Sequence, residues 1–479
     1  MPPSRPKPDP MELLKQLFAD RFGTQCEECL ALAGGGSSRR YYRLSGSGYS
    51  AIGTVADDRR ENEAFFAYTT HLHAKGMPVP ELYAVHPDRR HYLQQDLGDR
   101  TLYALLHDKK RAGGGFDAEM VTLYKQALAD LDAIQRAGRD MDFSLAFPRA
   151  AFDRRSMLWD LNYFKYFFLK LAHIPFDEEA LENDFGRFID YLLEADCTYF
   201  LYRDFQGRNI MVVDEQQGIA PRLAYIDYQG GRQGAAQYDV ASLLYSAKSA
   251  LPEALRQELL RHYVALHGDS RFMDHFWGYL LVRIMQTLGA YGYRGYFERK
   301  PYFLESIPLA VNNLRTVTSD HQLPVRLPEL ERVWRAIGEL RLAADPFPPD
   351  RLTVSVGSFS YKRGLPEDHS GNGGGFIFDC RALPNPGRYE QYRAYTGKDR
   401  PVVEFLEKEP AVDRFLDNVK GIVSQSIDKY LERKFTHLSV NFGCTGGQHR
   451  SVYCAERLAR WIGETYPSVS IDLRHREQS

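Results

Sequence analysis

The stretch "YRDFQGRNIMVVD" occupies residues 202–214, and "AYIDYQGG" follows it at residues 224–231. Asp204 and Asn209 lie on a loop that leads into an apolar, strand-like run, and Asp227 ends the next such run. Phosphoryl transfer requires this set, because one carboxylate accepts or orients the proton of the acceptor hydroxyl while an amide and a second carboxylate hold magnesium ions. Each residue alone could cap a turn or end a strand. The three in this order predict a phosphotransferase.

The segments around this loop divide into a strand-rich part and a helical part. Before residue 96, strand-like runs surround an amphipathic helix at residues 59–76, and a further helix is expected over residues 11–32. From about residue 100 the pattern is mostly helical. This layout predicts an α+β, two-lobed fold of the protein-kinase type, with an N-lobe over 11–96 and a C-lobe over 97–342.

A glycine-rich turn, "AGGGSSRRYYRL" (33–44), lies between two strand-like runs. Glycine allows backbone N–H groups to approach phosphate oxygens closely, although a plain hairpin would have the same sequence. No lysine occurs between Arg43 and Lys75, so the lysine that kinases carry on their third strand is missing. Either Arg39 or Arg40 is a candidate replacement, with a solvated strand residue as the alternative.

Five motifs resemble the aminoglycoside phosphotransferase and choline kinase superfamily over about residues 12–340. They are "SSRRYYRL", "QQDLGDRTL", "YRDFQGRN", "YIDYQGG" and "QYDVASLL". Within the superfamily the chain looks most like AmgK-type kinases, which phosphorylate the anomeric hydroxyl of N-acetylmuramate or N-acetylglucosamine in cell wall recycling. The resemblance implies ATP, with GTP as the alternative nucleotide, and Mg²⁺.

The resemblance also implies roles for individual residues. Asp204 is then the catalytic base, Asn209 and Asp227 are magnesium ligands, and Asp239 braces the catalytic loop. Glu63 corresponds to the glutamate of the N-lobe helix. The nucleotide would be bound by the glycine-rich turn and the hinge between the lobes, through Gly35, Gly36, Ser37, Ser38, Arg39, Arg40, Gln95, Asp96 and Leu97.

The apolar stretch "MLWDLNYFKYFFLKLAHI" (157–174) carries Asp160 and two lysines, so it is predicted to be a buried or groove-lining helix and not a membrane span. It lies where the superfamily carries its acceptor-binding insertion. Asp160, Tyr163 and Tyr166 are therefore candidate sugar contacts. A core helix with Asp160 at its surface is the alternative.

Three prolines in "AADPFPPDR" (343–351) predict a linker. Beyond it the pattern alternates between strand and helix, which predicts a small α/β domain with partly parallel strands over residues 352–479. The chain is thus expected to contain the two lobes, this linker and a further domain.

Within that domain, "GCTGGQHRS" (443–451) lies between a strand and a helix. Backbone N–H groups and the positive helix terminus would bind an anion there, and Arg450 would clamp it. The predicted anion site is Cys444, Thr445, Gly446, Gly447, Gln448, His449, Arg450 and Ser451. The field of the site should acidify Cys444.

The spacing from Cys444 to Arg450 is also that of a cysteine-dependent phosphatase. Gly443, however, stands where such enzymes carry histidine, and only Asp379 or Asp399 are candidate general acids. A bifunctional kinase and phosphatase is therefore an alternative function.

Residues 352–479 closely resemble the RapZ C-terminal domain, through "GSFSYKRGLP", "FIFDCRALPNP", "YTGKDRPVVEFL", "GCTGGQHRSVY" and "LRHR". The resemblance implies phosphosugar sensing and small-RNA binding in amino-sugar homeostasis, and it is compatible with self-association. The chain has no GxxxxGK[ST] motif of the kind that the N-terminal part of RapZ contains.

An RNA site would have to be a local patch, because basic and acidic residues are nearly balanced in this domain. The candidate basic residues are Lys362, Arg363, Arg381, Arg388, Arg393, Lys398, Arg400, His449, Arg450, Arg474 and Arg476. An RNA-binding regulator is a further alternative function.

The composition excludes several classes. A net charge of −2 over 479 residues creates no global field that would attract nucleic acid or an anionic membrane. Six cysteines do not make a disulfide framework, and no signal peptide is evident, so a cytoplasmic location is expected. The favoured function is an ATP- and Mg²⁺-dependent amino-sugar kinase with a phosphosugar-binding domain and no membrane partner.

Overall fold

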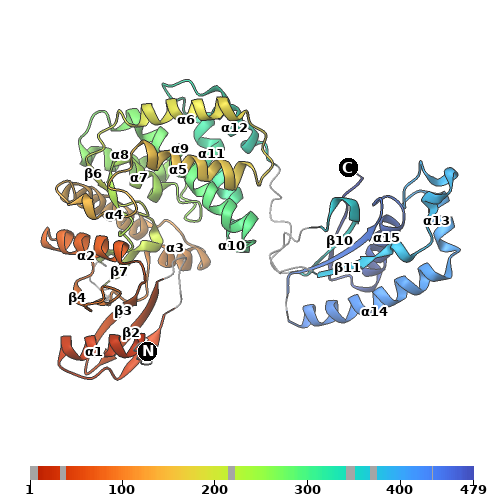
Figure 1. Cartoon of the computed structure of the whole chain (residues 1–479), viewed down its shortest axis with the longest axis horizontal. Helices are drawn as coiled ribbons and strands as arrows, with labels where there is room; N and C mark the ends of the chain where they lie inside the picture. The colour runs from red at the N-terminus through yellow and green to blue at the C-terminus, as the bar shows by residue number, and fades with distance from the viewer. Residues whose placement is uncertain are drawn as a thin grey trace, which may run out of the picture. The chain divides into compact units, whose positions relative to one another are not determined.

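The computed structural model describes residues 9–32, 39–213, 222–340, 351–366, 375–433 and 435–478. The chain divides into two compact units, one of residues 1–293 and 306–340 and the other of residues 294–305 and 341–479 (Figure 1). The predicted glycine-rich residues Gly35, Gly36, Ser37 and Ser38 and the predicted linker core lie outside the described residues.

The first unit begins with an antiparallel sheet in the strand order β1-β2-β3-β5-β4. Its strands are β1 (Glu28–Ala31), β2 (Arg40–Gly46), β3 (Tyr49–Val55), β4 (Leu82–Val85) and β5 (His91–Gln95). Helix α1 (Pro10–Phe22) packs across β3, β4 and β5. Leu14 and Phe18 of α1 join Leu44, Ala51, Val55 and Leu93 in a buried apolar core.

The prediction of a helix over residues 11–32 is wrong for the second half of that range. Helix α1 ends at Phe22, because Gly23 adopts a left-handed conformation with φ of 70° and donates its N–H to the Ala19 carbonyl. The chain then extends, so Cys29 lies on β1. The helix expected at 59–76 is confirmed as α2 (Arg59–Ala74).

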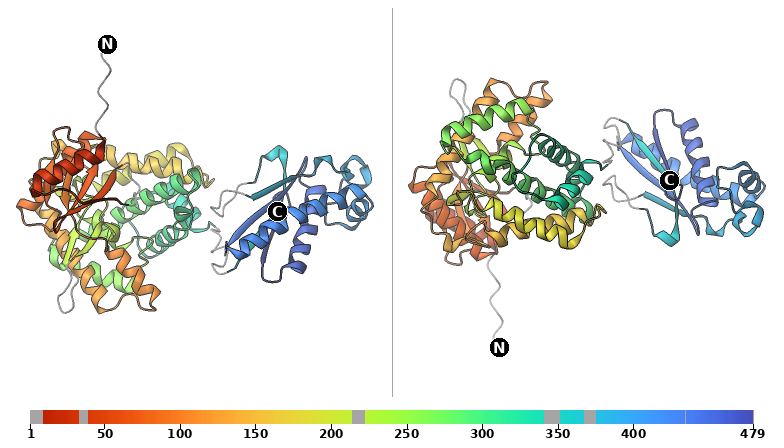
Figure 2. Two further views of the ribbon diagram at one scale, coloured as in Figure 1. Left: turned by 90° about the horizontal axis from the view of Figure 1, so that it is seen from below. Right: turned by 90° about the horizontal axis from the view of Figure 1, so that it is seen from above.

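Helices make up most of the rest of this unit, with α9 at their centre (Figures 1 and 2). They are α3 (Leu102–Arg111), α4 (Ala118–Ala137), α5 (Arg154–Phe164), α6 (Glu178–Leu192), α7 (Gln237–Leu244), α8 (Glu253–His267), α9 (Phe272–Tyr291), α11 (Ile307–Asp320) and α12 (Pro328–Gly338). Helix α9 is buried along much of its length and packs against α5, α7 and α11. A sheet-bearing lobe followed by a helical lobe confirms the predicted two-lobed α+β architecture.

Two short antiparallel pairs interrupt the helices. Strand β6 (Tyr199–Leu201) pairs with β9 (Arg232–Gly234), and β7 (Ile210–Val213) pairs with β8 (Arg222–Tyr225). The latter pair confirms strands within the expected stretches "NIMVVD" and "RLAYIDY", although β8 ends at Tyr225, before Asp227. These strands hold the loop that carries Asp204 and Asn209.

The second unit contains a four-stranded parallel sheet in the order β11-β12-β10-β13. Its strands are β10 (Thr353–Ser360), β11 (Gly375–Asp379), β12 (His437–Cys444) and β13 (Ser470–His475). Helices α13 (Arg400–Glu407), α14 (Pro410–Glu432) and α15 (Arg450–Thr465) connect them. Apolar residues of α14, α15 and the strands form one core, which confirms the predicted α/β domain with parallel strands.

Helix α10 (Pro301–Leu304) completes the helices that the structure assigns among the described residues. Within the same described part of the chain, no helix is both long and apolar enough to cross a membrane.

Candidate functional site

The loop after β6 brings the three predicted catalytic residues together. The Asn209 side chain is buried and its Nδ2 donates to the Asp204 carbonyl at 2.9 Å and to Asp227 Oδ2 at 3.1 Å. The Asp204 side chain remains about half exposed, at 51%. The accessible Asp204 carboxylate thus lies in one group with the buried Asn209 amide and the Asp227 carboxylate.

Asp227 has the properties of a cation ligand. It follows β8 with a left-handed φ of 71°, and Gln229 Nε2 donates to its Oδ1 at 2.8 Å. Burial, followed by the nearby charge of Asp204, raises the pKa of Asp227 to about 6. The hydrogen-bond donors to its carboxylate are the neutral amides of Asn209 and Gln229, and a divalent cation would offset its repulsion from the Asp204 carboxylate. The oxygen ligands of Asn209 and Asp227 fit Mg²⁺.

Asp239, on α7, holds the catalytic loop in position. Its carboxylate is fully buried and accepts the backbone N–H groups of Tyr202 at 2.7 Å and Arg203 at 2.9 Å. Burial raises its pKa to about 7 even though these hydrogen bonds act in the opposite direction. These contacts are those expected of the bracing residue.

Arg283, on α9, is a contact that sequence reasoning missed. Its Nη2 lies 3.4 Å from Asp204 Oδ1, its Nε donates to Ser242 Oγ at 3.0 Å, and its Nη1 donates to Thr287 Oγ1 at 3.0 Å and also contacts Gln286. Several fixed partners therefore hold its guanidinium beside the catalytic carboxylate. Arg283 lies in an apolar helix far along the chain, so no local motif marks it.

Arg39, and not Arg40, is the buried cation near the expected nucleotide site. Arg40 is exposed, whereas Arg39 is 4% exposed and its Nη1 donates to Tyr92 Oη at 3.2 Å. Its Nη2 lies 3.4 Å from Glu61 Oε2, in the first turn of α2. Strand β3 has Thr54, fully buried, opposite Tyr92.

Glu63, the expected counterpart of the N-lobe glutamate, does not contact the candidate cation Arg39, which pairs with Glu61. Glu63 instead pairs with Arg89, with 2.7 Å between Arg89 Nε and Glu63 Oε1. Because residues two apart on a helix do not share a face, only one of Glu61 and Glu63 can face Arg39. The Arg39–Glu61 contact thus joins the strand side of the N-lobe to the first turn of α2.

The hinge residues are structurally engaged. The Asp96 side chain accepts from Arg43 Nε at 2.7 Å and from Ser50 Oγ at 2.6 Å. The Gln95 side chain accepts from the Glu81 N–H at 3.3 Å, and Leu97 follows β5. The Gln95 N–H also donates to the Glu81 carbonyl at 2.8 Å, so both the side chain and the N–H of Gln95 are engaged within the sheet.

The predicted acceptor helix forms α5 and a following π-helix (Lys165–Leu169). Asp160 faces inward, and its Oδ1 accepts from Arg203 Nη2 at 2.6 Å. Its other oxygen is buried without a hydrogen-bond partner among the described residues. Tyr166 is about half exposed, with the amines of Lys165 and Lys170 over its ring. Asp160 thus supports the residue that precedes Asp204.

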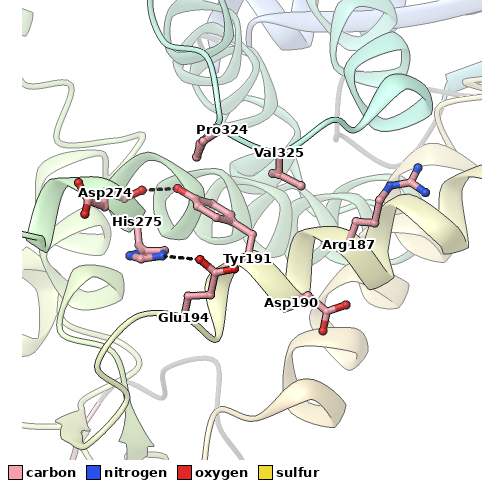
Figure 3. A pocket seen from close by; sticks show the side chains of 8 residues that line it. All are labelled: Arg187, Asp190, Tyr191, Glu194, Asp274, His275, Pro324 and Val325. Carbon is pink, nitrogen blue, oxygen red and sulfur yellow. Dashed lines mark hydrogen bonds and ion pairs between the residues drawn. The ribbon is translucent and has the colours of Figure 1, made fainter.

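A separate cavity of about 610 Å³ lies on the helical part of the first unit (Figure 3). None of the predicted site residues lines it. Its lining residues are Arg187, Asp190, Tyr191, Glu194, Asp274, His275, Pro324 and Val325. Figure 3 shows Tyr191 directed to the Asp274 carbonyl and His275 to Glu194. These four groups are thus already paired with one another.

In the second unit, the predicted anion loop joins β12 to α15. Cys444 is buried, its Sγ is 3.1 Å from Ser451 Oγ, and the Gly447 N–H donates to it at 3.2 Å. Burial alone would raise its pKa, but hydrogen bonds from Ser451 and from the backbone at Gly447 and Gly446 outweigh burial and lower the pKa. The predicted acidification of Cys444 is consistent with this geometry.

Three side chains of the loop form hydrogen bonds with main-chain carbonyls of neighbouring segments. Arg450 Nη1 donates to the carbonyls of Arg381 at 2.8 Å and Leu383 at 2.9 Å, so the predicted clamp braces residues 380–383. Gln448 and His449 bond to the carbonyls of residues 392–395. An anion would therefore be held mainly by backbone N–H groups of residues 445–447 and the helix terminus.

Two further residues shape the loop. Glu477 lies against Gly447, and its carboxylate pairs with Arg363 Nη1 at 2.9 Å. At Gly443, a Cβ atom would lie 2.4 Å from Tyr361 Cε2 and 2.5 Å from Phe359 Cζ. A side chain at this position, where cysteine phosphatases carry histidine, would have to displace the rings of Tyr361 and Phe359.

The phosphotransferase enzyme family model matches residues 28–276, and the RapZ C-terminal domain model matches residues 352–479. The first match covers more than half of the chain. The chain therefore belongs to the phosphotransferase enzyme family, whose members are kinases of small molecules, and it carries a RapZ C-terminal domain.

Curated relatives and solved structures are similar to parts of the chain. A nucleotide-binding protein of Laribacter hongkongensis is 42% identical over 129 residues, which are 27% of this chain and 44% of that protein. A nucleotide-binding protein of Cereibacter sphaeroides is 46% identical over 127 residues, which are 26% of this chain and 40% of that protein. The chain thus spans less than half the length of these relatives.

Among solved structures, Plasmodium vivax ethanolamine kinase is 10% identical, with a TM-score of 0.45 over 60% of this chain and 81% of the kinase. Choline kinase LicA from Streptococcus pneumoniae is 15% identical, with a TM-score of 0.43 over 64% of this chain and 99% of LicA.

Proposed function

We propose that the chain transfers the γ-phosphoryl group of ATP to a hydroxyl of an amino sugar of the N-acetylmuramate or N-acetylglucosamine type, as AmgK-like kinases do in cell wall recycling. The observation that carries the proposal is the contact of Asn209 with both Asp204 and Asp227, beside an accessible Asp204 carboxylate. GTP is the alternative phosphoryl donor.

Asp204 would accept the proton of the acceptor hydroxyl. The hydroxyl oxygen then forms a bond to the γ-phosphorus while the bond between that phosphorus and the bridging oxygen of ADP breaks. The products are ADP, the sugar phosphate and the proton held by Asp204. Arg283 orients the Asp204 carboxylate, and Asp239 holds the loop backbone on which Asp204 lies.

Asn209 and Asp227 would hold Mg²⁺, which when bound neutralises charge on the nucleotide phosphates. Arg39, fixed by Glu61 and Tyr92, would supply positive charge from the N-lobe. The glycine-rich turn and the hinge main chain at Gln95, Asp96 and Leu97 would complete the nucleotide site.

For the second unit we propose binding of a phosphosugar at the loop of Cys444–Ser451. The combination of a parallel strand, a backbone-lined loop and a helix N-terminus supports an anion ligand there. This domain would then bind a product of the same class that the first unit makes.

Phosphatase activity is the second candidate, favoured by the lowered pKa of Cys444. The candidate general acids are already engaged. Asp379 pairs with Arg381 at 2.7 Å, and Asp399 accepts from the Thr396 N–H at 2.6 Å and its hydroxyl at 2.9 Å. A loop that binds a phosphate ester without cleaving it requires no such acid.

The RNA-binding alternative has less support. Several of the candidate basic residues pair with carboxylates, which lowers the net charge available to RNA phosphates. The pairs are Arg363–Glu477, Arg381–Asp379, Lys398–Glu456, Arg400–Glu404 and Arg474–Asp472.

The test is a phosphotransfer screen with Mg²⁺ and ATP over N-acetylmuramate, N-acetylglucosamine, glucosamine, choline and an aminoglycoside. We expect turnover with one amino sugar, and loss of at least about 100-fold in kcat in Asp204→Asn, since a general base contributes about that much or more. Turnover only with choline or the aminoglycoside would overturn the amino-sugar assignment. Silence across the panel would overturn the proposed reaction.

A further inference from the structure

The turn between β4 and β5 holds a compact group of metal-ligand side chains that the phosphotransfer reaction does not use. The group consists of His86, Asp88 and His91, within a span of six residues. His86 Nδ1 lies 3.1 Å from Asp88 Oδ1, and His91 Nδ1 lies 2.7 Å from Asp88 Oδ2. One ligand atom from each residue lies within 4.8 Å of the other two.

We propose that His86, Asp88 and His91 form a binding site for a divalent transition metal ion, of which Zn²⁺ is the best match. Two imidazoles and one carboxylate are typical ligands of Zn²⁺, whereas Mg²⁺ prefers oxygen ligands alone. Three protein ligands leave the fourth tetrahedral position to water. This site is separate from the proposed Mg²⁺ ligands Asn209 and Asp227.

The main chain preorganises the carboxylate of the site. Asp88 Oδ1 accepts the N–H groups of Arg90 at 2.8 Å and His91 at 3.3 Å, so the side chain is held in the turn. Such outer hydrogen bonds orient metal-ligating carboxylates. The metal would therefore meet a carboxylate that is already in place.

The two imidazoles differ in exposure. The His91 side chain is 10% exposed and that of His86 is 29% exposed, which gives one anchored ligand and one that solvent can reach. His91 Nε2 is buried and has no hydrogen-bond partner among the residues that the structure describes. Without a metal, Nδ1–H donates to Asp88 Oδ2 at 2.7 Å, so a bound metal would replace this hydrogen bond and the ring would carry its proton on Nε2.

The side chain of Arg89, in the same turn, is engaged away from the site. Arg89 pairs with Glu63, and its guanidinium lies over the Phe66 ring at 4.6 Å from the centroid. Its charge is thus neutralised by a carboxylate of α2. A cation at the histidines would not compete with this arginine for Asp88.

The turn is also connected to α2. Asn62 Nδ2 donates to the Arg89 carbonyl at 2.9 Å and to the Ala56 carbonyl at 2.9 Å. Asn62 follows Glu61, the partner of Arg39. A metal in the turn would therefore stabilise the start of the helix that carries Glu61.

The test uses the full, untagged chain after treatment with a chelator. Titration with Zn²⁺ in excess Mg²⁺, followed by calorimetry and metal analysis, should show one tightly bound equivalent. An Asp227→Asn background keeps Zn²⁺ out of the proposed Mg²⁺ site without touching the turn. His86→Gln and His91→Gln should each weaken the binding at least tenfold.

His73 is an exposed histidine on α2, and His73→Ala is the control. This variant should bind Zn²⁺ with the affinity of the parent. His86→Gln changes a partly exposed side chain, so it tests the site even if His91→Gln does not fold. With Co²⁺ as a probe, tetrahedral visible absorption should appear in the parent and disappear in His86→Gln. No bound equivalent, or equal binding by the parent and His86→Gln, would overturn the proposal.

Discussion

The guanidinium of Arg39 is buried between Tyr92 and Glu61, and its positive charge is one of those that act on Asp227. A buried arginine with fixed partners contributes to nucleotide binding through its charge, because no lysine is available on β3. We expect Arg39→Met to raise the KM for ATP about tenfold or more, since a charged hydrogen bond contributes about 1.5–3 kcal/mol. Steady-state kinetics with varied ATP measure this change.

The two glutamates of α2 provide the matched comparison for Arg39. Glu61→Gln should raise the KM for ATP, because it leaves the buried guanidinium without its carboxylate partner. Glu63→Gln should leave it unchanged, since Glu63 pairs with Arg89. Equal effects of the two substitutions would contradict the role given to the Arg39–Glu61 pair.

The thiols of Cys444 and Cys29 should titrate in different pH ranges. Burial raises the pKa of Cys29, whereas hydrogen bonds from Ser451 and the loop backbone overcome burial and lower the pKa of Cys444. The Cys444 thiolate should therefore persist to lower pH. The difference in thiolate absorbance between wild type and Cys444→Ser, measured against pH, gives the titration midpoint of Cys444. The pH dependence of the alkylation rate gives the midpoint of Cys29. We expect the midpoint of Cys444 to lie at lower pH.

Ser451→Ala supplies the control for this titration. Loss of the Ser451 hydroxyl, 3.1 Å from Cys444 Sγ, should move the midpoint of Cys444 to higher pH and leave that of Cys29 where it is. A Cys444 midpoint at or above that of Cys29 would contradict the proposed geometry of the loop.

At the scale of elements, the sequence predicted what depends on local patterns. The strands β7 and β8 and the helix α2 were predictable because apolar runs and helical periodicity mark them. The extent of α1 was not, because the pattern of residues 11–32 continues through Gly23, where a left-handed φ ends the helix. The backbone conformation of one residue, Gly23, thus determines where α1 ends.

Side-chain partners between distant elements were harder to predict. Glu61 and Glu63 are both compatible with an ion pair to the sheet, and the choice depends on how α2 is rotated. The contact of Arg283 with Asp204 joins α9 to a loop 79 residues away. Arg450 was expected to clamp an anion, but its guanidinium donates to the carbonyls of Arg381 and Leu383. These outcomes depend on tertiary packing, which short motifs do not encode.

Two neighbouring glycines test the loop between β12 and α15. Gly447 has φ of 68°, and a Cβ atom there would lie 2.3 Å from Glu477 Cγ and 3.0 Å from the Ser360 nitrogen. A Cβ atom at Gly446 would meet no described atom within 4 Å, and the φ of Gly446 is not in the left-handed region. We expect Gly447→Ala to destabilise the second unit by more than about 1 kcal/mol and to abolish binding of inorganic phosphate. Denaturation and calorimetry measure both effects.

Gly446→Ala is the matched control for Gly447→Ala. It should retain the stability and the phosphate binding of the wild type, because the added methyl group meets open space and ordinary backbone angles. Similar losses in both variants would show that backbone conformation at Gly447 is not what the loop requires.

Glu477 should weaken anion binding at the same loop. Its side chain is 7% exposed and lies against Gly447, so its negative charge opposes an anion at the loop backbone. Glu477→Gln should increase the affinity for inorganic phosphate by about fivefold, or about 1 kcal/mol. Glu464→Gln, at an exposed position of α15, should not change it. An unchanged affinity in Glu477→Gln would contradict this effect.

At the scale of the whole molecule, each unit has an apolar core of its own. The buried core described for the second unit is formed by residues between Leu352 and Val469, and the core around α1 lies in the first unit. We therefore expect two thermal transitions with separate ligand responses. A ligand at one hundred times its Kd stabilises the state that binds it by about 2.7 kcal/mol. Mg²⁺ with ADP should raise the Tm of the first unit, and inorganic phosphate that of the second.

Two variants show which thermal transition belongs to which unit. Calorimetry of the full chain measures both transitions in one experiment. Asp227→Asn removes a proposed Mg²⁺ ligand and should abolish only the shift caused by Mg²⁺ with ADP. Gly447→Ala disturbs the anion loop and should abolish only the shift caused by phosphate. Since the two substitutions lie in different units, their effects should add without coupling. One transition that moves with either ligand would mean that the units unfold together, and a loss of both shifts in Gly447→Ala would mean that the anion loop supports the kinase fold.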